Sequence, residues 1–376
     1  MSLPAAARKE EFIIALVTLR ELNRATLARQ MLLERHAMKV PKAVAHLLGL
    51  QAQLPRPPFI GLWTRLEGLA RADVARAIES KAVVRATAMR GTIHLMAAAD
   101  FLAFRSCLQD GLDAGLHAIL RERAGTIDFP RLRAAALAYF RSPHNFEDAR
   151  AHLARAFPGG DVRALGYAAR LGVPLVQVPG GDAWSFPARA GFVSAETWLG
   201  KPVTPAAPLD RLVLRYLAAY GPATAKDAQA WLGVAGLDAV FEALSSKLAR
   251  IDAGKGKPLY DLPDAPRPDA DTPAPVRFLP EWDSAIVTRA DERFVARAHR
   301  PRVFLPGLRV AALVLVDGVA AATWKIAATS RKATLQVEAF GKWTAAIRRE
   351  VESEGQALLR FVEPDVTSYD FSIELP

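Results

Sequence analysis

The chain has 376 residues, of which 51% are hydrophobic and 23% are charged, and its formal net charge is +10. This composition is ordinary for a soluble globular protein, and the length is enough for two or three domains. Cys107 is the one cysteine, so the sequence excludes an intrachain disulfide, a CxxC zinc site and an iron–sulfur cluster.

The excess of positive charge lies mainly near the N-terminus. The first 100 residues contain 15 Lys or Arg and 8 Asp or Glu, which favours a polyanionic partner for this part of the chain. The simpler alternative is a basic composition that reflects the genome. No apolar run reaches the length of a membrane span, and Met1–Glu11 is polar and charged. We therefore expect a cytoplasmic protein that does not associate with membranes.

Residues 8–105 predict helices followed by a β-hairpin. Pro41 is suited to the first turn of a helix, and Asp73 is an acidic residue at a helix start. Two apolar segments flank Arg90 and Gly91, which predicts a hairpin with these residues at its tip. Helices followed by a hairpin are the outline of a winged helix. The predicted helices cover 19–35, 41–48 and 72–80, and the predicted strands cover 83–89 and 92–96.

The same outline recurs twice. In the third copy Thr224 and Asp227 are spaced as a capping pair, and Lys255 and Lys257 form the basic tip of the predicted wing. The second copy has predicted helices at 129–140, 145–157 and 161–171 and strands at 173–178 and 183–187. The third has helices at 209–220 and 225–232, a candidate recognition helix at 236–250 and a wing at 251–261.

A Pro-rich linker over 263–275 precedes a β-rich region, in which Asp317-Gly318 predicts a type I′ turn. The predicted fold is α+β, with three tandem winged-helix modules and a C-terminal β-barrel-like domain. The predicted domains are winged helices at 1–125, 126–205 and 206–262 and a β-rich domain with one long helix at 276–376. In the last domain, strands are predicted at 276–280, 309–316, 318–325, 332–339 and 369–375, and the helix at 343–361.

The segment Leu-Gln-Ala-Gln-Leu-Pro, residues 50–55, is the strongest candidate for chemistry. Gly49 and Pro55 both disfavour a continuous helix here, and in an extended segment Gln51 and Gln53 point to the same side. Two amide heads can hold and orient a water molecule, but neither can accept a proton as a carboxylate does. This suits a reaction whose leaving group departs easily. The alternative for such a pair is a helix cap or a solvated turn.

Four segments resemble the winged-helix DNA-binding domain family that contains the AlkZ- and YcaQ-type alkylpurine DNA glycosylases. They are LARQMLLER (27–35), GLQAQLPRPPFIGLW (49–63), VVRATAMRGTIHLM (83–96) and FLPEWDSAIV (278–287). The resemblance extends over nearly the whole chain, and Gln51 and Gln53 match the Gln-x-Gln pattern of the AlkZ-like branch.

The resemblance implies hydrolysis of the N-glycosidic bond of cationic N7-alkylpurines in damaged double-stranded DNA, bulky or crosslinked adducts included. Gln51 and Gln53 are then the catalytic residues, and a base that is already cationic needs no acid to leave. No lysine stands near the motif, which predicts a monofunctional enzyme. No metal, nucleotide or flavin is implied, because the sequence has no Gly-rich phosphate loop and no ligand cluster.

The resemblance and the sequence also suggest supporting residues. His94 and Thr92 are expected to support the site, although a histidine in an apolar strand is usually a core residue. Arg56, Arg90, Lys255 and Lys257 are expected to contact DNA phosphates, and the alternative for each is a solvated side chain.

Two rival functions stay open at this point. One is a non-catalytic winged-helix protein such as a transcription regulator, and the other is a protein that sequesters a lesion without cleaving it. A regulator usually dimerises to bind a palindrome. Three winged modules in one chain, without an evident dimerisation helix, favour a monomeric enzyme.

Overall fold

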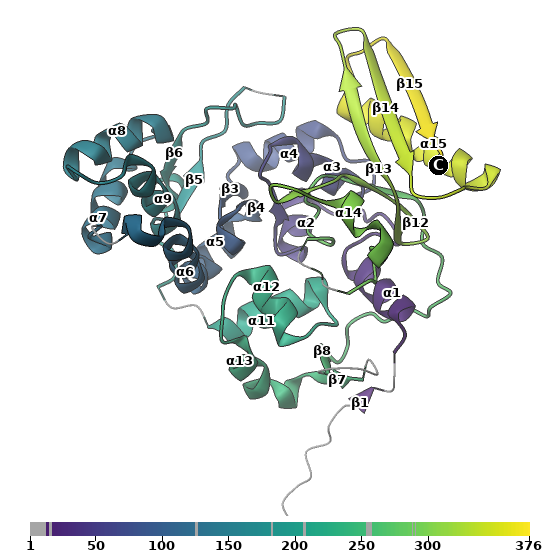
Figure 1. Ribbon diagram of the computed structural model, residues 1–376, viewed down its shortest axis with the longest axis horizontal. Helices are drawn as coiled ribbons and strands as arrows, with labels where there is room; N and C mark the ends of the chain where they lie inside the picture. The colour runs from purple at the N-terminus through teal and green to yellow at the C-terminus, as the bar shows by residue number, and fades with distance from the viewer. Residues whose placement is uncertain are drawn as a thin grey trace, which may run out of the picture.

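The computed structural model describes residues 13–14, 17–124, 127–181, 183–205, 208–252, 258–287, 289 and 291–376. Figure 1 shows helical units on several sides of a central hairpin, with a sheet and one long helix beside them. We refer to a first unit (17–124), a second unit (127–205), a third unit (208–262) and a C-terminal unit (276–376).

The first unit has the predicted order of helices followed by a hairpin. The side chains and backbones of Thr18 and Glu21 form a capping box that starts the first helix. This helix ends at Arg29, before the predicted residue 35, and Met31 after it has a left-handed backbone with φ 54°. The elements are α1 (Leu19–Arg29), α2 (Val40–His46), β2 (Leu50–Gln51), α3 (Arg56–Trp63), α4 (Arg71–Glu79), β3 (Val83–Thr87), β4 (Ile93–Ala97), α5 (Ala98–Phe104) and α6 (Gln109–Leu120).

In the second unit, aspartate or asparagine side chains cap the N-termini of three helices, as is favourable for unpaired N–H groups. The predicted strand at 183–187 is wrong, because Trp184 and Phe186 pack against Phe59 and Arg85 of the first unit instead. The strand that pairs with β5 comes later. The elements are α7 (Phe129–Tyr139), α8 (Phe146–Ala156), α9 (Val162–Gly172), β5 (Leu175–Gln177), β6 (Phe192–Ser194) and α10 (Ala195–Leu199).

The first and second units share one five-stranded sheet, with the strand order β2-β4-β3-β5-β6. Ala86 of β3 pairs with Val176 of β5, so the sheet continues across the predicted boundary between residues 125 and 126. In β2, Gln51 pairs with His94 of β4. The glutamine motif is therefore an edge of a sheet to which both units contribute.

The third unit contains the predicted capping pair: Thr224 and Asp227 form a capping box at the start of its second helix. The predicted helix over 236–250 is shorter, because Ala249 and Ile251 are buried as part of a strand. A two-residue strand, β1 (Ile13–Ile14), pairs in parallel with this strand. The elements are α11 (Leu209–Tyr220), α12 (Ala225–Leu232), α13 (Leu237–Ala243), β7 (Ala249–Ile251) and β8 (Leu259–Asp261).

The C-terminal unit contains an open five-stranded sheet of order β15-β14-β13-β12-β9. The expected barrel-like closure is wrong, because β9 and β15 lie at opposite edges and do not pair. The parallel pairing of β14 with β15 requires a crossover, and the long helix supplies it. Buried residues alternate with more exposed ones along β14, and the buried face packs under this helix. The elements are β9 (Arg277–Leu279), α14 (Arg300–Val303), β10 (Phe304–Leu305), β11 (Arg309–Val310), β12 (Leu313–Val316), β13 (Val319–Ala328), β14 (Lys332–Ala339), α15 (Ala345–Val362) and β15 (Ser368–Glu374).

The predicted turn at Asp317-Gly318 is present, with positive φ at both residues. It docks on α1: the carboxylate of Asp317 pairs with Arg20 and Arg24, and the carbonyl oxygen of Gly318 accepts a hydrogen bond from Asn23. These contacts attach the C-terminal sheet to the first helix of the chain.

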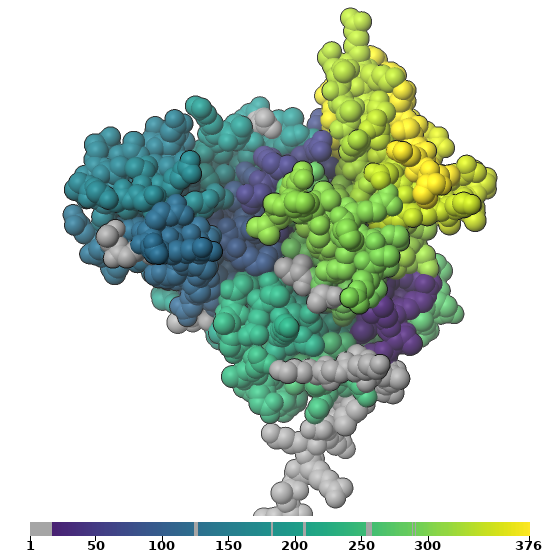
Figure 2. All heavy atoms as spheres, viewed as in Figure 1, coloured from purple at the N-terminus to yellow at the C-terminus, as the bar shows by residue number. Residues whose placement is uncertain are grey.

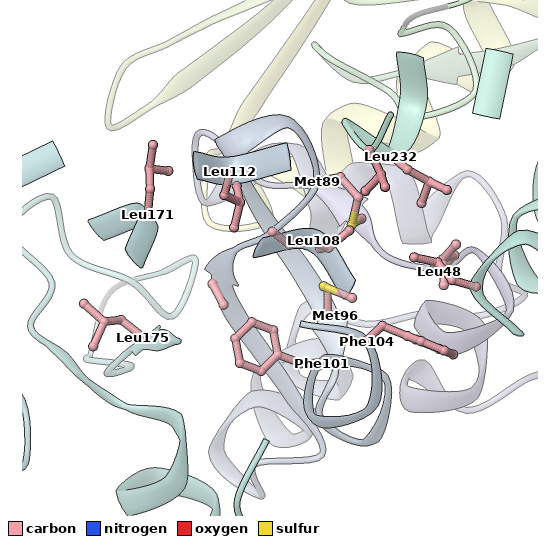
Figure 3. Close-up of a cluster of buried hydrophobic side chains, with 14 of the residues drawn as sticks. Leu48, Met89, Met96, Phe101, Phe104, Leu108, Leu112, Leu171, Leu175 and Leu232 are labelled. Atoms are coloured by element: carbon pink, nitrogen blue, oxygen red, sulfur yellow. The ribbon is translucent and has the colours of Figure 1, made fainter. Parts of the chain in front are cut away.

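One hydrophobic core joins the three helical units (Figure 3). Met89 and Met96 come from the hairpin of the first unit, Leu171 from α9, and Leu232 from α12. In Figure 2 the green surface of the C-terminal unit lies beside the blue surface of the first unit. The candidate site lies where these surfaces meet.

A buried arginine joins the first unit to the C-terminal unit. The guanidinium of Arg65 forms a two-pronged ion pair with Asp283, with both N–O distances 2.8 Å and both side chains almost fully buried. Its other N–H groups donate to the carbonyl oxygen of Gly61 and to the backbone and side-chain oxygens of Gln30. All five donors of this guanidinium are therefore satisfied.

Asp283→Ala should lower the free energy of unfolding by about 3–5 kcal/mol, because it leaves the charge of Arg65 buried without its partner. Urea unfolding of the full chain measures this. Asp370→Ala is the matched control: Asp370 pairs with Lys332 at the surface, both about half exposed, and we expect a loss of less than about 1 kcal/mol. Equal losses in the two variants would contradict the central role of the buried pair.

Candidate active site

The two glutamines lie where the chain leaves α2 and joins the central sheet. Gly49 has φ 96°, and a Cβ there would lie 3.1 Å from the carbonyl oxygen of Leu95, so this turn favours glycine. Gln51 pairs with His94, which confirms the predicted extended backbone. Gln51 is buried, with 7% of its surface exposed, whereas Gln53 is exposed.

Both glutamines line one pocket of about 540 Å³, to which all four units contribute. Its lining offers amide groups, two guanidinium groups and apolar or aromatic surface. Among the described residues that line it, none is a carboxylate or a lysine. They are Gln51, Gln53, Arg90, Gly91, Thr92, Gly111, Leu112, Gly115, Ile119, Tyr167, Arg170, Leu171, Gly233, Trp282, Gly307 and Leu308.

Gln51 is held at both its backbone and its side chain. Its N–H donates to Ser284 Oγ at 3.2 Å, and its Oε1 accepts from Arg90 Nη2 at 2.8 Å. Gln53 is held less tightly: its Oε1 lies 3.4 Å from the N–H of Ile93. Arg85 also donates to the carbonyl oxygens of Ala52 and Gln53, at 2.9 and 3.1 Å. The extended shape of the motif is therefore fixed by side chains from distant segments.

Arg90 lies at the predicted hairpin tip, but its guanidinium turns inward. It donates to Gln51 Oε1 and to the carbonyl oxygen of Trp231, and it lies over the ring of Trp231. Burial lowers the pKa of Arg90 to about 10, so the group stays charged at neutral pH. Its N–H groups thus have protein partners, and a phosphate contact stays a prediction.

His94 is fully buried behind the motif, and Thr92 is partly exposed to the pocket. A carbonyl oxygen can only accept, so the contact of His94 Nδ1 with the oxygen of Thr92 at 3.1 Å places the proton on Nδ1. Burial, and then the charge of Arg90, lowers the pKa of His94 to about 3. His94 is therefore neutral at physiological pH and has no proton to donate as an acid.

The model of a protein family described as DNA glycosylase AlkZ-like matches residues 44–361. The chain belongs to the AlkZ-like DNA glycosylase family. Its function is that of a DNA glycosylase in DNA repair, and DNA is its substrate. The matched range includes both glutamines, the hairpin and the segment around Asp283, which confirms the resemblance drawn from the sequence.

Among solved structures, the chain is similar to Streptomyces sahachiroi DNA glycosylase AlkZ, with a TM-score of 0.79. The two are 18% identical, and the match covers 96% of this chain and 100% of that chain. The fold is therefore shared over almost the full length. A search of curated proteins finds no match. Within the described ranges, no helix has the length and apolar character of a membrane span, and no three acidic, histidine or cysteine side chains are grouped as metal ligands.

Of the other predicted DNA-contact residues of this AlkZ-like chain, the structure describes Arg56, which does not line the pocket. Arg56 lies at the start of α3, in a separate depression with Glu281 and Lys325. Lys255 and Lys257 lie outside the residues that the structure describes. Arg170 of α9 is the second cationic side chain among the described lining residues, and its role was not predicted from the sequence.

Sequence reasoning also missed the large side chains at the pocket. Tyr167 and Ile119 are 44% and 49% exposed, and Leu308 is 94% exposed at the tip of the β10–β11 hairpin. Trp282 donates through Nε1 to the carbonyl oxygen of Leu308 at 2.9 Å. Trp282 thus holds the hairpin tip of the C-terminal unit at the pocket. The sequence signal for Leu308 is Pro-Gly-Leu at 306–308, because Pro and Gly favour a turn and place an apolar leucine in it.

His94→Asn should flatten the dependence of stability on pH. The pKa of His94 is about 3 when folded and near 6.5 when unfolded, so the unfolded chain binds more protons between these values. The wild-type chain should lose up to about 1.4 kcal/mol per pH unit from this group as the pH falls below about 6.5. Urea unfolding at pH 7, 6 and 5 measures the slope.

His117→Asn, in the exposed part of α6, is the control and should keep the wild-type slope. If His94→Asn and the wild type lose stability in parallel as the pH falls, His94 is not a buried neutral group.

Proposed function

We propose that this glycosylase hydrolyses the N-glycosidic bond of cationic N7-alkylpurines in double-stranded DNA, with Gln51 and Gln53 as its catalytic residues. The observation that supports this most is the meeting of both amide side chains in one pocket, next to apolar surface and without a carboxylate among the described lining residues. Amides can orient water and stabilise charge, but they cannot activate a poor leaving group by protonation.

The proposed mechanism follows from the substrate charge. An N7-alkylguanine carries a positive charge, so the bond to the sugar breaks to release a neutral base and leaves an oxocarbenium-like sugar. Gln51 and Gln53 would place a water molecule at C1′ and direct carbonyl dipoles toward the developing positive charge. His94, with its pKa lowered to about 3, supplies no proton, so the positive charge that the lesion already carries must activate the leaving base.

The apolar side chains at the pocket suit a base that has left the stack. Tyr167, Trp282 and Leu308 offer aromatic and aliphatic surface beside the glutamines, and extruded bases are commonly held by stacking. Gly115 of α6 lines the same pocket, and a Cβ built on it meets no atom within 4 Å. This open side supports the expectation that N7 substituents larger than methyl are accepted.

We also propose that the enzyme is monofunctional and binds DNA with little regard to its sequence. The described lining residues include no lysine that could form a Schiff base with the sugar, which supports a monofunctional enzyme. The net charge of +10 supports binding to the phosphate backbone with little dependence on sequence. We expect the enzyme to be monomeric and cytoplasmic and to need no cofactor.

Gln51→Ala and Gln53→Ala should each lower the single-turnover rate of N7-methylguanine release about 100-fold, because loss of one orienting amide misplaces the water. The double variant should abolish release. Affinity for the same duplex should stay close to that of the wild type. The measurement is alkali-induced strand cleavage of an oligonucleotide duplex with one N7-methylguanine.

Gln356→Ala, on α15 and not among the residues that line the pocket, is the matched control and should cleave at the wild-type rate. Release by the double variant at the wild-type rate would refute the catalytic role of the pair.

A panel of single-lesion duplexes tests the charge argument. N7- and N3-methylpurines should be released, whereas uracil, 8-oxoguanine and unmodified guanine should not, because their neutral bases leave poorly without an acid. The rates are compared under identical single-turnover conditions. Removal of uracil or 8-oxoguanine as fast as N7-methylguanine would overturn selection by charge while leaving the glycosylase assignment intact.

A further inference from the structure

A chain of contacts leads from the third unit to the amide of Gln51. We propose that Arg90 is a positioning residue that fixes this amide, and that the third unit serves catalysis by holding Arg90. This inference rests on the proposed catalytic role of Gln51. Arg90 does not itself touch the reacting atoms in this proposal.

The contact between Arg90 and Gln51 fixes which end of the amide faces which way. A guanidinium has only N–H donors, so the atom that faces Arg90 Nη2 at 2.8 Å must be the carbonyl oxygen of Gln51. A flipped amide would set N–H groups against N–H groups. One lone pair of Oε1 is thus used, and the second lone pair and two N–H groups remain for water and substrate. The side chain of Gln53 accepts from the N–H of Ile93 at 3.4 Å, and among the described residues no guanidinium holds its amide.

Arg90 is itself fixed by the end of α12. Its Nη1 donates to the carbonyl oxygen of Trp231, and its guanidinium carbon lies 5.5 Å from the centre of the indole ring. The hairpin tip also presses against Gly233: a Cβ there would lie 2.8 Å from the nitrogen and 3.0 Å from the Cα of Arg90. Arg90 adopts a left-handed backbone with φ 56°, which is uncommon for a residue with a side chain. The approach of α12 and the turn therefore determine where the guanidinium lies.

Trp231 also supports the backbone of Gln51 by a second route. Its Nε1 donates to the carbonyl oxygen of Ser284 at 3.4 Å, and Ser284 Oγ accepts the N–H of Gln51 at 3.2 Å. Trp231 is thus connected to the side chain of Gln51 through Arg90 and to its backbone through Ser284.

The helix α13 offers no basic side chain to DNA phosphates. It covers the first part of the predicted recognition helix at 236–250, carries Asp238 and Glu242 and has no lysine or arginine within Leu237–Ala243. Lys247 and Arg250 of the predicted helix follow after it. Both acidic residues are exposed. The contacts between the end of α12 and the hairpin tip are therefore the observations that connect this unit to the glutamine site.

Removing Arg90 should therefore lower the rate of the chemical step and leave DNA binding nearly unchanged. Arg90→Met should reduce the single-turnover rate of N7-methylguanine release about 10- to 100-fold, since a loose amide populates unproductive rotamers. The decisive measurement is a double-mutant cycle with Gln51→Ala. In the Gln51→Ala background, Arg90→Met should cause no further loss, because the group that it positions is gone.

Two further variants keep the test decisive. Arg90→Lys keeps a buried cation but cannot bridge Gln51 and Trp231 with a planar fork, and it should give an intermediate rate. This variant replaces Arg90→Met in the cycle if the methionine variant does not fold. Arg293→Met is the matched control: Arg293 is a buried arginine that donates to Thr26 and Pro222, away from the pocket. It should lower stability without lowering the rate at saturating DNA.

The outcomes separate the two proposals. If Gln51→Ala releases N7-methylguanine at the wild-type rate, the proposed function fails. If Gln51→Ala is slow but the effects of the two substitutions multiply independently, or if folded Arg90 variants cleave at the wild-type rate, the positioning role fails. A weaker affinity for DNA with an unchanged rate at saturation would make Arg90 a phosphate contact and would also overturn it.

Discussion

The guanidinium of Arg65 is the constraint on which the site depends. It pairs with Asp283, and through Gln30 it reaches the third unit, because the amide nitrogen of Gln30 donates to the carbonyl oxygen of Ala219 at 2.6 Å. The five donors of Arg65 thus hold the segments around Gln30, Gly61 and Asp283 together. A buried ion pair is weak as a source of net stability, but removing one partner is costly. The pair therefore specifies one arrangement of the segments around it.

The segment that Asp283 anchors brings Ser284 to the backbone of Gln51 and Trp282 to the pocket. Ser284 accepts the backbone N–H of Gln51, and Trp282 holds the hairpin tip at Leu308. The contact of Ser284 with Gln51 forms only when the C-terminal unit docks on the first unit. The contact of Trp282 with Leu308 lies within the C-terminal unit and places Leu308 at the pocket. The pocket is therefore assembled by all four units, and the glutamine motif in the first unit is incomplete without the segments that follow it.

The electrostatics of the pocket agree with this architecture. Arg90 and Arg170 line it, and burial lowers the pKa of each. The same burial, together with the charge of Arg90, keeps His94 neutral. A site with fixed cations, a neutral histidine and amide side chains can bind phosphate and orient water, but it has little means to protonate a base. These features agree with the proposed chemistry, in which the leaving group departs unaided.

The sequence by itself determined the local features: the capping box at Thr224, the hairpin around Arg90, the extended course of Gln51 and the kinship with the AlkZ-like glycosylases. Near neighbours in the sequence favour the first three, although side chains from distant segments also hold the motif at Gln51 in the structure. The kinship follows from the matching segments. It did not determine that Arg90 turns inward, that the C-terminal sheet stays open, or that Tyr167 and Leu308 reach the same pocket as Gln51. Only the tertiary structure decided these features. The inward turn of Arg90 and the shared pocket depend on contacts between residues more than a hundred positions apart. The open sheet depends on which edges are left unpaired. A local pattern is compatible with either outcome, and packing selects between them.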